Sequence, residues 1–114
     1  MRKVDLAAAA QHLQQLPNIG PSIAGDLRSI GVLQPQDLVQ ADPYALYVAL
    51  CQHTRKRHDP CWIDCALAAV DFMRGAPPRA WWDYTAERKQ ALALAESGAG
   101  PLALAARWVA GAPL

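Results

Sequence analysis

The sequence predicts an all-α protein, with a compact helical domain followed by a C-terminal helical extension. Alanine and leucine dominate a composition that is 53% hydrophobic, and alanine has the highest helix propensity of all residues. No stretch of the chain alternates apolar and polar residues as a half-buried strand does. Several prolines also stand where helices are expected to begin, at the first helical position, where a missing N–H costs nothing.

Size and charge limit the classes of function. A chain of 114 residues with a formal net charge of +1 fits one small domain. Because the charge is nearly balanced, any contact with nucleic acid must depend on local geometry and not on a broad basic field. No apolar run is long enough for a secretion signal or a membrane span. The three cysteines are an odd number, which favours reduced thiols, and we therefore expect a cytoplasmic protein with no membrane contact.

Helix start and stop signals predict five helices in the first 75 residues. Asp5 is placed to cap a helix over residues 6–16, and Pro21 opens a second helix over 21–30 that ends before Gly31. The other three begin at prolines, two of which follow a capping aspartate, and are predicted over residues 35–39, 43–53 and 60–74.

The composition changes after Gly75, where prolines and tryptophans gather. Thr85 is placed to cap the next helix, and Pro101 opens the last one. The predicted elements are an ordered loop over 75–84, a helix over 86–95, a loop over 97–100 and a helix over 101–110. We expect residues 76–114 to pack as an extension on a domain formed by residues 1–75.

The stretch "LPNIGPSIA", residues 16–24, predicts a tight turn between two helices. Ala24 is small enough for a close helix crossing, and the apolar residues expected to meet across the turn are Leu13, Leu16, Ile23 and Leu27. Ile19 is apolar within a turn, which indicates that it fills the gap between the helices. Gly20 is expected to allow a backbone bend that other residues cannot adopt.

The same turn is suited to an anion. We expect the N–H groups of Ile19, Gly20 and Ser22 to point outward at the start of the second helix. Free N–H donors and the positive end of the helix dipole together favour a phosphate at such a place. A turn that binds no ligand is the alternative interpretation.

This stretch resembles the helix-hairpin-helix motif of DNA repair and recombination proteins, written h-x-x-h-P-G-I-G-x-x-x-A. The resemblance implies binding of the DNA phosphate backbone from the minor groove, without reading of the bases. Asn18 stands where a glycine is usual, and asparagine tolerates a positive φ. Ser22 stands where such hairpins often carry lysine, and it adds a hydrogen-bond donor but no charge.

Four stretches carry a wider resemblance: "LPNIGPSIAGDLRSIGV", "DPYALYVALC", "HDPCWIDCALAAVDF" and "WWDYTAERK". Together they are similar to the pathogenicity locus proteins, a small bacterial family in which some members are named mitomycin-resistance proteins. The match covers roughly residues 13–89, and its first half also resembles the C-terminal domain of bacterial competence regulators. Both resemblances imply a helix-hairpin-helix domain, here residues 1–75, and DNA binding, and neither implies a defined biochemical activity.

A basic cluster lies between two predicted helices. Arg55, Lys56 and Arg57 follow one another directly. We interpret them as a second phosphate contact beside the turn, with Arg28 as a further cation that assists it. The alternative is a solvated loop, which is the usual place of a run of charges.

Five soft metal ligands lie within 15 residues, namely Cys51, His53, His58, Cys61 and Cys65. Their spacing does not match a standard zinc site, and cysteines on an apolar helix face are usually buried. We therefore expect no metal and no cofactor, and keep these residues only as candidates. Two other roles stay open: a Cys61 thiol activated by the helix dipole, which nearby aspartates oppose, and a redox pair with Cys51.

The aromatic residues divide into two groups. Trp62 and Phe72 are predicted to lie in the core. Trp81, Trp82 and Tyr84 are predicted to fasten the extension to the core, and the alternative is that they stack on unpaired bases or on a partner protein.

The function that these patterns favour is non-enzymatic, weak DNA binding with little sequence preference. Since one hairpin with little net charge binds weakly, a protein partner or a homodimer would strengthen the contact. The alternative is a protein–protein interaction module on the same fold that does not bind DNA. No arrangement of catalytic residues stands out that would indicate an enzyme.

Overall fold

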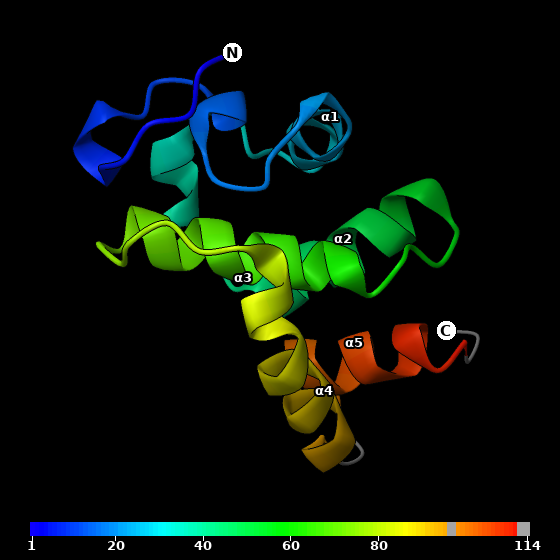
Figure 1. Ribbon diagram of the computed structural model, residues 1–114. Coiled ribbons are helices and arrows are strands. Elements are labelled where there is room, and N and C mark those ends of the chain that lie inside the picture. The colour runs from blue at the N-terminus through cyan, green and yellow to red at the C-terminus, as the bar shows by residue number, and fades with distance from the viewer. Residues whose placement is uncertain (96–97, 112–114) are drawn as a thin grey trace.

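The computed structural model describes residues 1–95 and 98–111, and all regular structure within these ranges is helical (Figure 1). This confirms the predicted all-α fold. The α-helices are α1 (Pro21–Ser29), α2 (Pro43–Thr54), α3 (Cys61–Met73), α4 (Thr85–Leu94) and α5 (Pro101–Val109). Short 3₁₀ helices are η1 (Ala7–Ala9), η2 (Leu13–Gln15), η3 (Pro35–Leu38) and η4 (Trp81–Tyr84).

The predicted helix over residues 6–16 is wrong, because this segment forms η1 and η2, with Ala10 and His12 extended between them. Asp5 caps neither of them, since the residue before η1 is Leu6. The side chain of Gln15 explains the break: its Oε1 accepts hydrogen bonds from the N–H groups of Gln11 and His12 at 2.8 and 3.0 Å. These bonds replace the backbone bonds that a continuous helix needs.

The prolines and aspartates that predicted helix starts lie where expected in the middle of the chain. The Asp42 carboxylate accepts hydrogen bonds from the N–H groups of Tyr44 and Ala45 at the start of α2. The Asp59 carboxylate does the same for Cys61 at the start of α3, at 2.8 Å. These side chains satisfy N–H groups that a helix leaves without partners in its first turn. At the end of α1, Gly31 has a φ of +94° and stops the helix as predicted.

Helix α3 lies at the centre of the molecule (Figure 1). It packs against α2, α4, η1, η3 and η4. Trp62 and Phe72 are buried on it, as predicted, and alanines along the same helix allow its neighbours to approach closely. Tyr47 of α2 and Trp62 place their rings 6.3 Å apart in a tilted arrangement. The core is therefore continuous from the N-terminal turns to the extension.

The segments after Gly75 lie against this core. Helix α5 packs along α2, and α4 packs against α3, η4 and α5. Thr85 is the first residue of α4 and not its cap, because its hydroxyl is engaged with α3 instead. Of the predicted loop over 97–100, Ser97 lies outside the described residues. No helix within the described part of the chain is long and apolar enough to cross a membrane.

Candidate nucleic-acid interface

The turn between η2 and α1 is packed from inside. The side chain of Ile19 is completely buried, which confirms that it fills the gap at the turn. Leu16 and Ala24 are also fully buried on either side of it. The turn is thus a fixed part of the core and presents only its outer side to solvent.

Of the two backbone expectations for the turn, the one for Asn18 is confirmed and the one for Gly20 is wrong. Gly20 has φ −92° and ψ −173°, an extended conformation that any residue adopts. Asn18 takes the left-handed conformation, with a φ of +65°. The expected need for a glycine at position 20 is therefore wrong. A Cβ added to Gly20 would meet no atom within 4 Å, so the turn tolerates a side chain there.

Two of the three expected N–H donors, those of Gly20 and Ser22, are without a backbone acceptor among the described residues where the turn meets α1. The Ile19 N–H donates to the Leu16 carbonyl at 3.3 Å, so it is not free as expected. The Gly20 N–H has no acceptor within the described part of the chain. Ser22 lies in the first turn of α1, where an N–H has no partner within the helix, and its side chain is exposed. These donors and the positive end of the α1 dipole favour an anion.

Lys3 supplies a positive charge that the pattern of the turn did not indicate. Its ammonium donates hydrogen bonds to the backbone carbonyls of Gln14, Leu16 and Ile19, at 2.9, 2.8 and 2.7 Å respectively. Partial burial lowers the pKa of Lys3 below its ordinary value. Because a lysine ammonium has three donors, this one is saturated, and only its charge is left to attract an anion.

Asn18 also ties the turn to the start of η4. Its Nδ2 donates to the Arg79 carbonyl at 2.8 Å, and its Oδ1 accepts from the Trp81 N–H at 3.2 Å. The contact joins residues more than sixty positions apart in the chain. Trp81 is half-buried against the core, whereas the adjacent Trp82 is 64% exposed. The two indole rings meet edge to face with centroids 5.6 Å apart.

Arg28 and Ser22 lie at opposite ends of α1. Helical rise places Arg28 about 12 Å along the axis from Gly20, so the two do not converge on one phosphate. Between them, the Asp26 carboxylate accepts a hydrogen bond from the Trp62 indole at 3.2 Å. This bond fastens α1 to the start of α3.

The basic loop lies between the ends of α2 and α3, beside the C-terminal end of α5 (Figure 1). Arg55 and Lys56 are exposed, and Arg55 ends α2 in a left-handed conformation with a φ of +56°. Arg57 donates to the Val109 carbonyl at the end of α5, at 3.1 Å. One of the three predicted phosphate contacts is therefore engaged within the protein, and two are available.

The candidate metal ligands do not gather. Within residues 1–95 and 98–111, no three histidine, cysteine or acidic side chains form a group that would hold a metal ion. Cys51 and Cys65 are buried, and burial raises the pKa of Cys65 to about 11. Burial and the neighbouring Asp59 carboxylate raise the pKa of Cys61. The structure thus argues against an activated thiol at Cys61, because the helix dipole does not prevail over desolvation and negative charge.

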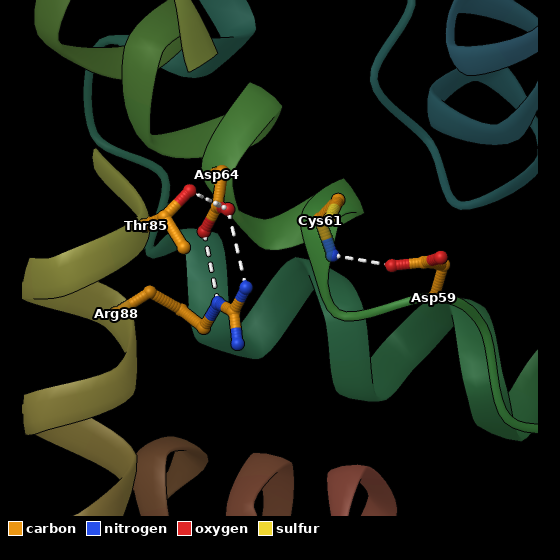
Figure 2. A network of polar contacts seen from close by, with 5 residues as sticks. All are labelled: Asp59, Cys61, Asp64, Thr85 and Arg88. Atoms are coloured by element: carbon orange, nitrogen blue, oxygen red, sulfur yellow. Dashed lines mark hydrogen bonds and ion pairs between the residues drawn. The ribbon is translucent and has the colours of Figure 1, made fainter. Parts of the chain in front are cut away.

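A buried polar network joins α3 to α4 (Figure 2). Asp64 is completely buried and accepts from Arg88 Nε at 2.9 Å and from the Thr85 hydroxyl at 2.8 Å. Figure 2 shows the Arg88 guanidinium extended from α4 toward the carboxylate on α3. The sequence predicts a helix around Asp64 but does not indicate that Arg88 is its partner, because the two residues are 24 positions apart. The network binds the extension to the core.

Comparisons with known proteins agree with the resemblance. A model of the family described as "Pathogenicity locus" matches residues 6–90. The chain is also similar to a mitomycin resistance protein, McrB, of Streptomyces lavendulae. The two are 41% identical over 81 residues, which cover 71% of this chain and 77% of that protein. No solved structure matches the chain.

Proposed function

This chain belongs to the pathogenicity locus family, and we propose that it is a non-enzymatic protein that binds the phosphate backbone of DNA at the turn between η2 and α1. The Gly20 N–H, without an acceptor in the described residues, carries this proposal. A phosphate oxygen would accept hydrogen bonds from Gly20 and Ser22 at the positive end of the α1 dipole. Binding through phosphates gives little sequence preference.

The charge of Lys3 supports the same site. Ser22 adds no charge where a helix-hairpin-helix often carries lysine. The Lys3 ammonium is nevertheless close to the turn, because it donates hydrogen bonds to the Leu16 and Ile19 carbonyls. Because the C=O and the N–H of one trans peptide point in opposite directions, the ammonium lies across the Ile19–Gly20 peptide from the Gly20 N–H, so Lys3 adds a longer-range positive charge and not a direct phosphate contact. Since the net charge is only +1, few phosphates are neutralised, so the affinity is weak and falls with salt along a shallow slope.

Fluorescence anisotropy with labelled duplex DNA at low salt tests the proposal. Gly20→Glu places a carboxylate where the phosphate would lie, and the backbone tolerates the side chain. Gly25→Glu is the matched control, because it adds the same charge at an exposed position of α1 that is equally open. We expect Gly20→Glu to weaken binding by about tenfold or more, the effect of roughly 1.4 kcal/mol, and Gly25→Glu to change it much less. The absence of binding at concentrations on the order of tens of micromolar, or equal effects of the two variants, would contradict the proposal.

The alternative function is a protein–protein interaction module on the same fold. The neutral Ser22 at the mouth of the turn favours it. Sedimentation velocity separates the two functions, because a stable complex with a protein that forms without DNA and tolerates Gly20→Glu supports the alternative. The name of the relative also identifies mitomycin resistance as the phenotype to score in cells that carry these variants.

A further inference from the structure

Trp82 is an unusual aromatic residue in this structure. Four of the eight aromatic side chains are buried in the core, Tyr47, Trp62, Phe72 and Tyr84, and three more are packed against it. Trp82 instead exposes 64% of its surface to solvent. Its indole contacts the Trp81 ring on one side, and most of its remaining apolar surface is open to solvent; tryptophan is enriched at binding surfaces.

The position of Trp82 is held by the turn itself. Trp81 is fixed through its N–H to the Asn18 side chain, and Trp82 follows it with a Cα only about 3.8 Å further along the chain. The edge-to-face contact with Trp81 restricts the rotation of the exposed ring. The backbone that carries the indole is therefore tethered to the turn that forms the proposed phosphate site, and it is not a flexible tail.

The same segment offers little net charge. Arg79 and Asp83 are both exposed close to Trp82, and their opposite charges nearly cancel. What the segment adds to the turn is thus a stacking surface and not a second anion site. The paired bases of a duplex are stacked on one another and present no free face, whereas an unpaired base does.

From this juxtaposition we propose that Trp82 stacks on an unpaired base of the strand whose phosphate lies at the Gly20 turn. The preferred ligand is DNA that combines a duplex with unpaired nucleotides, such as a gap or a single-stranded end, and not continuous duplex. The inference rests on the proposed phosphate contact. It assigns to Asn18 a positioning role that a glycine at this place cannot have.

The test measures binding to two labelled DNAs, a continuous duplex and the same duplex with a short gap of unpaired thymines. Wild-type protein binds the gapped DNA more tightly. Trp82→Ala loses about tenfold in affinity for the gapped DNA and little for the duplex, because stacking of one base on an aromatic ring contributes an amount of that order. Trp82→Phe keeps most of the preference. Leu94→Ala, at a residue 72% exposed, is the control for removal of exposed apolar surface.

Asn18→Gly tests the tether separately. Glycine adopts the positive φ of this position without steric strain, so the turn persists while both side-chain hydrogen bonds to residues 79 and 81 are lost. We expect duplex binding to remain and the preference for gapped DNA to fall. Circular dichroism confirms that each variant is folded. A 2-aminopurine placed in the gap reports stacking directly, because its fluorescence falls when Trp82 is present.

The outcomes separate this inference from the proposed function. If Trp82→Ala binds both DNAs as the wild type does, or weakens both equally, the stacking role is wrong while the phosphate contact stands. If the wild type binds neither DNA, the proposed function fails. Self-association or a protein complex that is lost only in Trp82→Ala would overturn the inference in favour of a protein contact.

Discussion

The Arg88 guanidinium and the Asp64 carboxylate form a buried ion pair, with Nε and Oδ1 2.9 Å apart and side-chain exposures of 7% and 0%. Removal of one partner leaves an uncompensated charge in the core. We expect Arg88→Met to reduce the free energy of unfolding by about 3–5 kcal/mol. Urea denaturation followed by circular dichroism measures this, with the exposed Glu87→Gln as a control that changes stability little.

The same pair predicts a compensation. When both charges are replaced by apolar groups, no charge remains buried without a partner. We expect Asp64→Leu combined with Arg88→Met to recover most of the stability that Arg88→Met loses. A double variant that loses the sum of both single effects would show that the two side chains do not interact.

Lys3 is expected to stabilise the turn between η2 and α1. Lys3→Met removes three hydrogen bonds to backbone carbonyls, and hydrogen bonds that involve a charged group contribute about 1.5–3 kcal/mol when buried. Because Lys3 is partly exposed, we expect a loss at the lower end of this range. Arg2→Met is the matched control, since the neighbouring Arg2 is exposed and makes none of these bonds. Equal melting temperatures for the two variants would contradict the role of Lys3.

His58 makes stability depend on pH. Its pKa is lowered, above all by burial, with the Asp26 carboxylate opposing and Lys56 adding to the effect. The unfolded chain therefore takes up a proton first, below about pH 6.5, and the free energy of unfolding falls as the pH drops from there toward the folded-state pKa.

The variant His58→Gln tests this dependence. A hydroxyl has one proton, and the Thr54 hydroxyl donates it to the Leu50 carbonyl, so His58 Nε2 is the donor in its 2.7 Å contact with Thr54. A glutamine amide replaces that donor but does not titrate. We expect the variant to lose less stability than the wild type between pH 7.5 and 5.5 in thermal melts. Parallel curves for the two proteins would contradict the assignment.

Local signals predicted the helices well where the chemistry is local. Asp42 caps α2 and the Asp59 carboxylate binds the first N–H group of α3, because such a side chain reaches only the next two or three N–H groups. The first helix was predicted wrongly because Gln15 and Lys3 engage backbone groups that the apolar pattern does not encode. Asn18 stands where a glycine is usual in such turns, and its φ of +65° confirms the expected left-handed conformation.

The contacts of the candidate site that join distant parts of the chain could not be predicted from the spacing of residues in the sequence. The bonds from Asn18 to Arg79 and Trp81 span more than sixty residues, and the Lys3 contacts cross two 3₁₀ helices. Nothing in the spacing of such residues indicates which partners meet, since their approach is decided by the packing of α3 against the N-terminal turns. The basic loop shows the same limit. The sequence does not distinguish Arg57 from its two neighbours, and only the folded position of the end of α5 gives Arg57 a hydrogen-bond partner.

Thiol labelling is expected to distinguish the cysteines. Cys61 is half-buried and has a raised pKa, and the pKa of the buried Cys65 is about 11. At pH 8 both therefore hold little thiolate, and we expect slow reaction with Ellman's reagent, with Cys61 before Cys65. Asp59→Asn keeps a residue that caps helices and removes the negative charge, so Cys61 should react faster. An unchanged rate would show that Asp59 does not control this thiol.

The three cations of the basic loop are expected to behave differently in DNA binding. Arg55 and Lys56 are exposed, and the replacement of a phosphate-contacting cation by alanine reduces the slope of log affinity against log salt by about one. Arg57 is instead bound to the Val109 carbonyl, so Arg57→Ala should lower the melting temperature while the salt slope changes little. Anisotropy titrations at several salt concentrations measure the slopes. If no variant changes the slope, the loop is solvated and the turn at Gly20 carries the contact alone. If Arg57→Ala alone changes it, Arg57 contacts a phosphate in addition to its bond to Val109.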